Sequence, residues 1–515
     1  MLRHKKEHPP MNKIVAIQEH LRPALQVVFG CKDYEDEKRL LERVDLILRR
    51  SGVERMFLEL SQEQFDANAA KMKAAGEQVQ TGVKAIERYL THSSRALRCT
   101  VLKNLVGGSY REMSKALAMS PLYRWFCGAE QFAVIRVPGK STVRDYAHWL
   151  PAQQMERILA TLARAVADED HAREIGLESE LDMVVAWVDT TCLKACIHFP
   201  IDWVLLRDAV RTLVKCILTI RRHGLKRRIP EPEDFLRQIN ALSMGMSAAA
   251  RRKPGSKRER KRVLRAIKRV SKLVEEHGQR YRDALDKHWS RSDLTRKEAE
   301  VILGRMDNVL VQLPRARRQA HERIIGGRKV ANAEKILSLY ESDLHVIVRG
   351  KAGADVEFGS SLFLAENADG FILDHELKRE ISEGDAKWLQ QRYAGMKENS
   401  GDRLCGVVAD RGFESKASRS MLEEDGVFNG ICPRDPRELA RRMREDELFR
   451  VTIRRRAQTE ARVAVLKNVF LGVIPRAKGF ENRQLQVAWA VLSHNLWVLA
   501  RLPWACQQRA AAEAA

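Results

Sequence analysis

The stretch Met183-Val-Val-Ala-Trp-Val188-Asp189-Thr-Thr191 sets the expected fold of this chain. Six apolar residues, several of them β-branched, form a run of the length of a buried strand. We therefore predict a buried strand with Asp189 at its carboxyl end. The alternative is that Asp189 caps the helix that follows.

A second stretch, Arg403-Leu-Cys-Gly-Val-Val-Ala409-Asp410-Arg-Gly-Phe413, repeats this arrangement, since an apolar strand ends in Asp410 and breaks at Gly412. Further strand patterns cover residues 344–348, 356–364, 370–377 and 427–432. The turn-rich segment Asn367-Ala-Asp-Gly370 separates two of them and predicts a hairpin. Because strands alternate here with helical patterns, we expect an α/β core with a mixed sheet and flanking helices.

A helix is predicted at Ile453-Arg-Arg-Arg456-Ala-Gln-Thr-Glu460-Ala-Arg-Val-Ala-Val-Leu-Lys467, which contains no Gly or Pro and many good helix formers. At about 100° per residue, Arg456, Glu460 and Lys467 fall on one stripe roughly 60° wide. Such a stripe is a solvated face with ion pairs four residues apart, or a metal ligand beside phosphate-binding groups. Two strand-end aspartates that can meet Glu460 favour the second interpretation.

Three carboxylates without thiolate or paired histidine ligands suit Mg²⁺ or Mn²⁺. Two such ions roughly 3.5–4 Å apart would support an in-line displacement at a phosphodiester. We therefore predict Asp189, Asp410 and Glu460 as catalytic and metal-binding residues. Arg456 and Lys467 would hold the flanking phosphates of DNA.

At these residues the chain resembles the bacterial insertion-sequence DDE transposases marked by a Y-x2-R-x3-E-x6-K signature. Arg456, Glu460 and Lys467 match its spacing, whereas Ile453 stands in place of the tyrosine. Asp189-Thr190, Asp410-Arg-Gly-Phe413, Cys196-Ile-His-Phe-Pro200 and Val356-Glu-Phe-Gly359 are also similar to this group. The resemblance covers about residues 95–500 and implies an RNase H-like core, DNA cleavage at element ends and strand transfer. The 221 residues from Asp189 to Asp410 imply a helical insertion in that core.

Composition agrees with a polyanionic partner. The 515 residues include 91 Lys+Arg against 68 Asp+Glu, a formal charge of +23 and a pI near 9.8. Nucleic acid is the commonest partner of such a chain, although anionic membranes and acidic proteins also attract basic proteins. No apolar run approaches the roughly 18 residues of a spanning helix, so we expect no membrane partner and a cytoplasmic, nucleoid-associated location. Double-stranded DNA and a homodimer in the DNA complex are the expected partners.

The expected organisation has five parts. They are an N-terminal helical region (1–92), a helical, helix-turn-helix-like DNA-binding domain (93–180), an RNase H-like catalytic domain (181–222 and 341–480), a basic helical insertion (223–340) and a C-terminal helix and tail (481–515). The length of the chain agrees with two to four domains.

Two segments outside the acid motifs are predicted to touch DNA. The helix after Pro138 offers Lys140 and Arg144 to solvent. The window Arg251–Arg269 holds eleven Lys/Arg against one acid, Glu259, which predicts phosphate contacts or else a solvated helix exterior. The proposed contacts of this window are Lys257, Arg258, Arg260, Lys261 and Arg262.

Overall fold

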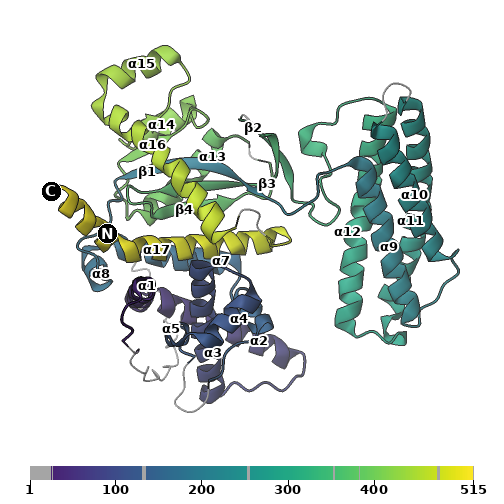
Figure 1. The fold of residues 1–515 in the computed structure, drawn as a ribbon, viewed down its shortest axis with the longest axis horizontal. Coiled ribbons are helices and arrows are strands. Elements are labelled where there is room, and N and C mark those ends of the chain that lie inside the picture. The colour runs from purple at the N-terminus through teal and green to yellow at the C-terminus, as the bar shows by residue number, and fades with distance from the viewer. Residues whose placement is uncertain are drawn as a thin grey trace, which may run out of the picture.

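The computed structural model describes residues 25, 27–129, 135–251, 256–351, 354–381, 383–472 and 476–513. The structure is a mixed sheet flanked by helices, with a helical bundle set apart from it (Figure 1). Most of the first 26 residues of the expected N-terminal region, and Arg252 and Lys253 of the basic window, lie outside the described residues.

Six strands form one sheet. They are β1 (Val185–Lys194), β2 (His345–Lys351), β3 (Ala354–Glu366), β4 (Ile372–Leu377), β5 (Gly406–Ala409) and β6 (Phe428–Ile431). Their order is β2-β3-β1-β5-β6, and β4 pairs with β3 beside this path. β3 is antiparallel to β1, β2 and β4, whereas β5 is parallel to β1 and β6 is parallel to β5. The predicted mixed sheet is therefore confirmed.

The predicted hairpin is the β3–β4 connection. The Asn367 Oδ1 accepts hydrogen bonds from the backbone N–H groups of Asp369 and Phe371, and Gly370 has a φ of 89°. Asparagine and glycine are the residues that such a turn favours. Gly359 allows β3 to approach β1 closely, because a Cβ at this position would collide with the Leu193 carbonyl oxygen. Only glycine permits that close approach.

The prediction for the end of the first strand was wrong. β1 runs five residues beyond Asp189, because Thr190 and the residues after it continue the antiparallel ladder with β3. The parallel pairing with β5, however, ends at Val188 opposite Ala409. Asp189 and Asp410 are thus the residues directly after the last parallel pair, so the two aspartates lie side by side. Asp189 does not cap a helix, since the next helix begins at Asp202.

The N-terminal helices share a core with the sheet. These helices are α1 (Lys32–Arg50), α2 (Val53–Ala74), α3 (Val83–Val106), α4 (Tyr110–Met119), α5 (Pro121–Phe126), α6 (Lys140–Tyr146), α7 (Ala152–Ala167) and α8 (Glu169–Glu174). The helices after β4 are α13 (Asp385–Asn399), α14 (Lys416–Glu424), α15 (Pro436–Glu445), α16 (Glu447–Val465) and α17 (Phe480–Glu513). α17 packs against α1, α3 and α7, so the N- and C-terminal parts of the described chain form one body.

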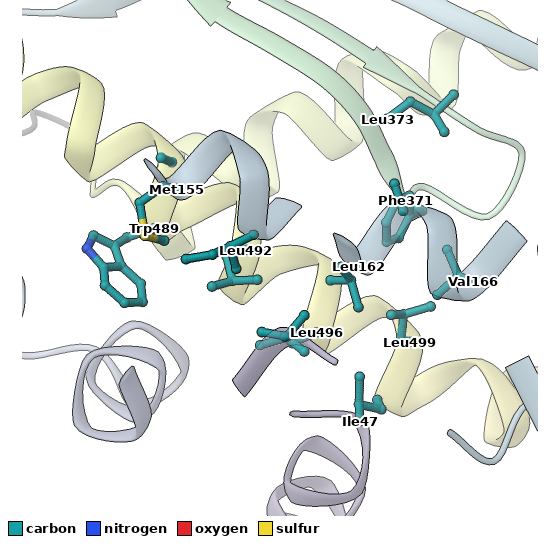
Figure 2. Packing of buried hydrophobic residues seen from close by; sticks show 14 of the residues in the cluster. Ile47, Met155, Leu162, Val166, Phe371, Leu373, Trp489, Leu492, Leu496 and Leu499 are labelled. Atoms are coloured by element: carbon teal, nitrogen blue, oxygen red, sulfur yellow. The ribbon is translucent and has the colours of Figure 1, made fainter. Parts of the chain in front are cut away.

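The spacing of apolar residues explains that packing. Trp489, Leu492, Leu496 and Leu499 recur at intervals of three and four residues on α17, and they meet Ile47 of α1 and residues of α7 (Figure 2). In β3, Phe363 and Ala365 face this core, while Leu362 and Leu364 face a second core formed with α16 and α17. Successive side chains of β3 thus point into two different cores, as they do in a strand that is buried on both faces.

A four-helix bundle with its own core interrupts the sheet between β1 and β2. It contains α9 (Asp202–Arg222), α10 (Pro232–Arg251), α11 (Ser256–His288) and α12 (Arg296–Ala320). A short helical turn, η1 (Trp289–Arg291), lies between α11 and α12, and η2 (His321–Ile325) and η3 (Asn332–Glu334) follow α12. The expected insertion at 223–340 therefore differs from the structure in one respect. α9, which we assigned to the catalytic domain, packs in the bundle because its apolar face meets α11 and α12.

Hydrogen bonds around Asp202 join the segment that enters the bundle to the segment that leaves it. Asp202 is buried, and its Oδ1 accepts hydrogen bonds from Gln319 Nε2 at 2.8 Å and Arg323 Nη1 at 3.0 Å. The Gln319 Oε1 in turn accepts from the backbone N–H of Ile336 at 2.7 Å. The first residue of α9 is thereby joined to the segment that leads back to β2.

The expected helix-turn-helix elements are present as helices. Ser109 and Glu112 form the predicted capping box of α4, and Ser120 caps α5 with Pro121 in its first turn. Leu122 and Phe126 of α5 are buried, as expected of a core helix. Within the described residues, no helix combines the length and apolar character needed to cross a bilayer.

Candidate active site

α16 carries the signature residues and is fixed on the sheet by its other face. Asp446 caps it by accepting a hydrogen bond from the backbone N–H of Phe449. The Trp187 indole N–H donates to the Thr452 carbonyl at 3.0 Å, and the Arg455 guanidinium stacks over the Trp187 ring at 3.8 Å. The predicted helix is confirmed as far as Val465, after which the chain widens into a π-helical turn, η4 (Leu466–Phe470).

A buried ion cluster locks α16 to the β3–β4 hairpin. Glu366, at the end of β3, is 4% exposed and accepts a hydrogen bond from the Thr459 hydroxyl at 2.8 Å. Arg455 and Arg462 each place a guanidinium nitrogen 3.6 Å from its carboxylate and donate to the Ala368 carbonyl. Burial raises the pKa of Glu366, and the two arginines and Thr459 oppose that rise. The sequence analysis missed this cluster.

The opposite face of α16 brings the third acid to the two aspartates. Arg456 Nη2 lies 3.1 Å from Glu460 Oε1 and 4.0 Å from Asp410 Oδ2. Asp189 Oδ1 accepts from the Thr190 backbone N–H at 2.9 Å, and Asp410 Oδ1 accepts from the Gly412 N–H at 2.8 Å. Asp410 from a strand-end loop and Glu460 from the helix thus approach one guanidinium, and Asp189 on the central strand interacts with it electrostatically.

The electrostatics of Asp189 link the three acids. Burial raises the pKa of this carboxyl to about 6, Arg456 and the Thr190 N–H lower it, and Asp410 and Glu460 raise it further. Asp410 and Glu460 therefore both lie within electrostatic reach of Asp189. A buried carboxylate with two anionic neighbours is stabilised in its charged form by any cation that enters the site.

The fit to a divalent ion is incomplete in this arrangement. Among the described residues, no group of three or more His, Cys, Asp or Glu side chains is gathered closely enough to hold a metal ion. Arg456 pairs with Glu460 instead, which satisfies part of the negative charge. The donor set still consists of carboxylate oxygens, the type that Mg²⁺ and Mn²⁺ prefer. The Glu460 side chain is 58% exposed, so it has room to turn from Arg456 toward the aspartates.

Lys467 lies farther along the same stripe. Its Nζ donates to the Thr191 hydroxyl at 3.1 Å, two residues after Asp189 on β1. Arg456 interacts electrostatically with Asp189, and Lys467 contacts the same strand two residues farther along. Ile453 is half-buried and has no hydroxyl to offer.

A fourth carboxylate, which the sequence analysis did not identify, lies beside these residues. Asp385 is the first residue of α13, and its Oδ1 accepts a hydrogen bond from the Thr190 hydroxyl at 3.2 Å. A Cβ at Gly412 would lie 3.0 Å from Asp385 Oδ2 and 2.9 Å from Asp410 Oδ1, so both carboxylates border this glycine. In the sequence Asp385 looks like an ordinary acid in the first turn of a helix, where a carboxylate interacts favourably with the helix dipole. Nothing there marks it as a site residue.

No protein-family model, curated protein or solved structure matches this chain. The geometry of the described residues must therefore support any functional assignment.

The other predicted DNA contacts lie away from the carboxylates. Lys140 and Arg144 are exposed on α6, where Arg144 pairs with Asp145 at 2.9 Å. Figure 1 shows α11 in the bundle, separated from the sheet and α16. Of the predicted contacts on α11, three are exposed and two are half-buried: Lys257, Arg258 and Arg262 are exposed, whereas Arg260 and Lys261 are half-buried.

Proposed function

We propose that the chain is a DDE transposase that cleaves DNA at the ends of an insertion sequence and joins the cut strand to target DNA. The observation that supports the proposal is that Asp410 and Glu460 approach Arg456 at 4.0 and 3.1 Å, while Asp189 interacts electrostatically with all three. An RNase H-like core is part of the proposal. The sheet supports it through a central β1 with antiparallel β3 and β4 on one side and parallel β5 and β6 on the other.

In this proposal Asp189, Asp410 and Glu460 hold Mg²⁺ or Mn²⁺, with two ions in the active complex. The ions supply Lewis acidity and an activated oxygen nucleophile for the phosphodiester displacement. Arg456 releases Glu460 and binds a phosphate of the DNA, which offers a guanidinium the same bidentate geometry as a carboxylate. Lys467 binds a second phosphate beside Thr191.

Double-stranded DNA is the proposed partner, with two copies of the chain in the complex and the nucleoid as the location. The +23 net charge and the exposed cations of α11 support this part of the proposal. Replacing Lys257, Arg258, Arg260, Lys261 and Arg262 with Ala should reduce the salt dependence of DNA binding, by about 0.9 in log–log slope for each phosphate that is no longer neutralised. An unchanged slope would assign this stretch to solvated helix surface.

The decisive test of the catalytic proposal is Asp410→Asn. This change removes a charge but keeps the side-chain shape, so Mg²⁺-dependent cleavage of element-end DNA should be abolished while DNA binding stays measurable. Asp170→Asn, at an exposed position of α8, is the matched control and should cleave normally. Cleavage by Asp410→Asn at the wild-type rate would refute the assignment. Cleavage without strand transfer by the wild-type chain would indicate a metal-dependent nuclease on the same core.

A catalytically silent DNA-binding derivative of a transposase is the second candidate. The Arg456–Glu460 ion pair favours it, because it occupies the carboxylate that the metal requires. DNA binding without cleavage by the wild-type chain in either Mg²⁺ or Mn²⁺ would select this candidate.

A further inference from the structure

A basic cleft lies between α3 and the segment that leads into α6, far along the chain from the acid motifs. Its volume is about 650 Å³. One wall is α3, which contributes Lys84, Arg88, His92 and Arg95, and Arg136 contributes from the other side together with Thr142 and Tyr146 of α6. Glu87 is the one acid among the described residues that line it. Four cations against one carboxylate give the lining a formal charge of +3.

Three cations of α3, Lys84, Arg88 and Arg95, lie on one stripe of the helix together with His92. Positions 84, 88, 92 and 95 recur at intervals of four and three residues, which places them on one face of the helix about 80° wide. At 1.5 Å per residue the stripe extends for roughly 16 Å. One strand of duplex DNA carries a phosphate for about every 3.4 Å of helix axis, so the stripe spans on the order of five phosphates.

Carboxylates of the described chain do not compensate these charges. Among the residues that the structure describes, Lys84, Arg88, Arg95 and Arg136 make no ion pair. Arg95 instead donates from Nε to the Gly128 carbonyl at 3.2 Å, which fixes its guanidinium at the edge of the cleft. Lys84, Arg88 and Arg136 are exposed.

Another arginine of the same helix is paired in the usual way. Arg98 is buried between Asp45 and Glu54, with a guanidinium nitrogen 2.5 Å from the first carboxylate and another 2.6 Å from the second. The interior-facing Arg98 therefore has two carboxylate partners. The cations that face the cleft remain available for an anion from outside.

The neighbouring arginines affect the pKa of His92. Burial lowers the pKa of the imidazole, and Arg95 and Arg88 lower it further. The ring nitrogens of His92 add hydrogen-bonding groups to the lining. Thr142 and Tyr146 add hydroxyl groups, so the lining combines cations with neutral hydrogen-bonding groups. This combination is typical of contacts to a phosphodiester backbone.

We propose that this cleft binds the phosphodiester backbone of DNA. It is a positioning contact that holds the N-terminal helical body on the duplex, separate from the exposed cations Lys140 and Arg144. The assignment to DNA rests on the proposed function, whereas the anionic character of the ligand follows from the lining alone. Contacts to phosphates carry no sequence information, so the cleft adds affinity without base preference.

The test is the salt dependence of DNA binding by the full-length protein. The triple variant Lys84→Ala/Arg88→Ala/Arg136→Ala should lower the slope of log K against log salt concentration by about 2.7, since each phosphate that is no longer neutralised removes about 0.9. Fluorescence anisotropy with a labelled duplex of random sequence measures this slope over roughly 50 to 200 mM salt, where binding of this kind weakens steeply.

Two further variants make the result specific. Arg50→Ala/Lys71→Ala/Lys73→Ala removes the same net charge from exposed positions outside the cleft lining, and it should leave the slope nearly unchanged. Lys84→Arg/Arg88→Lys/Arg136→Lys keeps the charge and should retain the wild-type slope. Circular dichroism of each variant establishes that it folds.

Three outcomes would overturn the proposal. The first is an equal slope for the cleft variant and the charge-matched control. The second is competition by single-stranded RNA at the same concentration as duplex DNA, abolished in the cleft variant, which would identify RNA as the ligand. The third is a weaker affinity of the cleft variant for a poly-glutamate peptide without any change for DNA. Failure of the proposed function is distinguishable, because cleavage by Asp410→Asn would refute catalysis while leaving the slope measurement intact.

Discussion

Replacing Asp189 with Asn should stabilise the metal-free protein at neutral pH. Burial holds the pKa of this carboxyl at about 6 instead of 3.8, with Asp410 and Glu460 contributing to the rise. Each tenfold change in proton affinity corresponds to about 1.36 kcal/mol, so the ionised carboxylate at about pH 7.5 costs up to roughly 3 kcal/mol of folding free energy. The asparagine side chain would carry no charge and could still accept a hydrogen bond from the Thr190 N–H.

The sign of the pH dependence follows from proton binding. Between about pH 4 and pH 6 the folded protein binds the Asp189 proton more tightly than the unfolded chain does. The wild-type protein therefore loses stability as the pH rises through this window, whereas the variant does not. The advantage of Asp189→Asn should be largest above about pH 6 and should disappear toward about pH 4. At neutral pH, Mg²⁺ should reduce the stability difference between the variant and the wild type, because it stabilises the wild-type carboxylate.

Hydrogen exchange of peptides from β1 and β5 is the suitable assay, because a chain with a separate bundle need not unfold in one step. A difference of roughly 3 kcal/mol corresponds to exchange up to about 100-fold slower in the variant at about pH 7.5. Asp170→Asn, at an exposed position, should leave these peptides within about 0.5 kcal/mol of wild type. Equal protection of variant and wild type at neutral pH, or faster exchange in the variant, would refute the reasoning.

Two other substitutions test the supports of the site. Arg455→Ala leaves the buried Glu366 carboxylate with one arginine fewer and uncovers Trp187. It should therefore lower the free energy of unfolding by about 3–5 kcal/mol. Arg454→Ala, at an exposed position, should lower it by less than about 0.5 kcal/mol. Thermal unfolding measures both, and equal melting temperatures for the two variants would contradict the role of the cluster. Asp385→Asn removes a charge that accepts from Thr190 and borders Gly412, and it should reduce Mg²⁺-dependent cleavage about 10- to 100-fold with DNA affinity unchanged. Cleavage at the rate of Asp170→Asn would show that Asp385 has no part in the site.

Local sequence patterns predicted the elements that carry the site. Asp189 and Asp410 lie side by side because two β-rich runs pair in parallel up to Val188 and Ala409, and the helical stripe placed Glu460 toward them. The continuation of β1 beyond Asp189 could not be predicted, since Thr190 and its successors become strand only by pairing with β3, which lies far along the chain beyond the bundle.

The missed residues are those whose partners are distant in sequence. Glu366 is a strand-end acid like Asp410, and only its burial between Arg455 and Arg462 reveals it as a structural anchor. Asp385 resembles an ordinary first-turn acid until Thr190 is placed beside it. The apolar spacing of α9 predicted a helix but not whether its face would meet the sheet or the bundle.

The hydrogen bonds at Asp202 connect the two chain crossings between the bundle and the sheet. Gln319 of α12 joins Asp202 to Ile336, so a movement of α12 would act on the segment that precedes β2 and on the segment that follows β1. That strand carries Asp189 and, through Thr191, contacts Lys467. A movement of the bundle would therefore act on the strand that holds the central carboxylate.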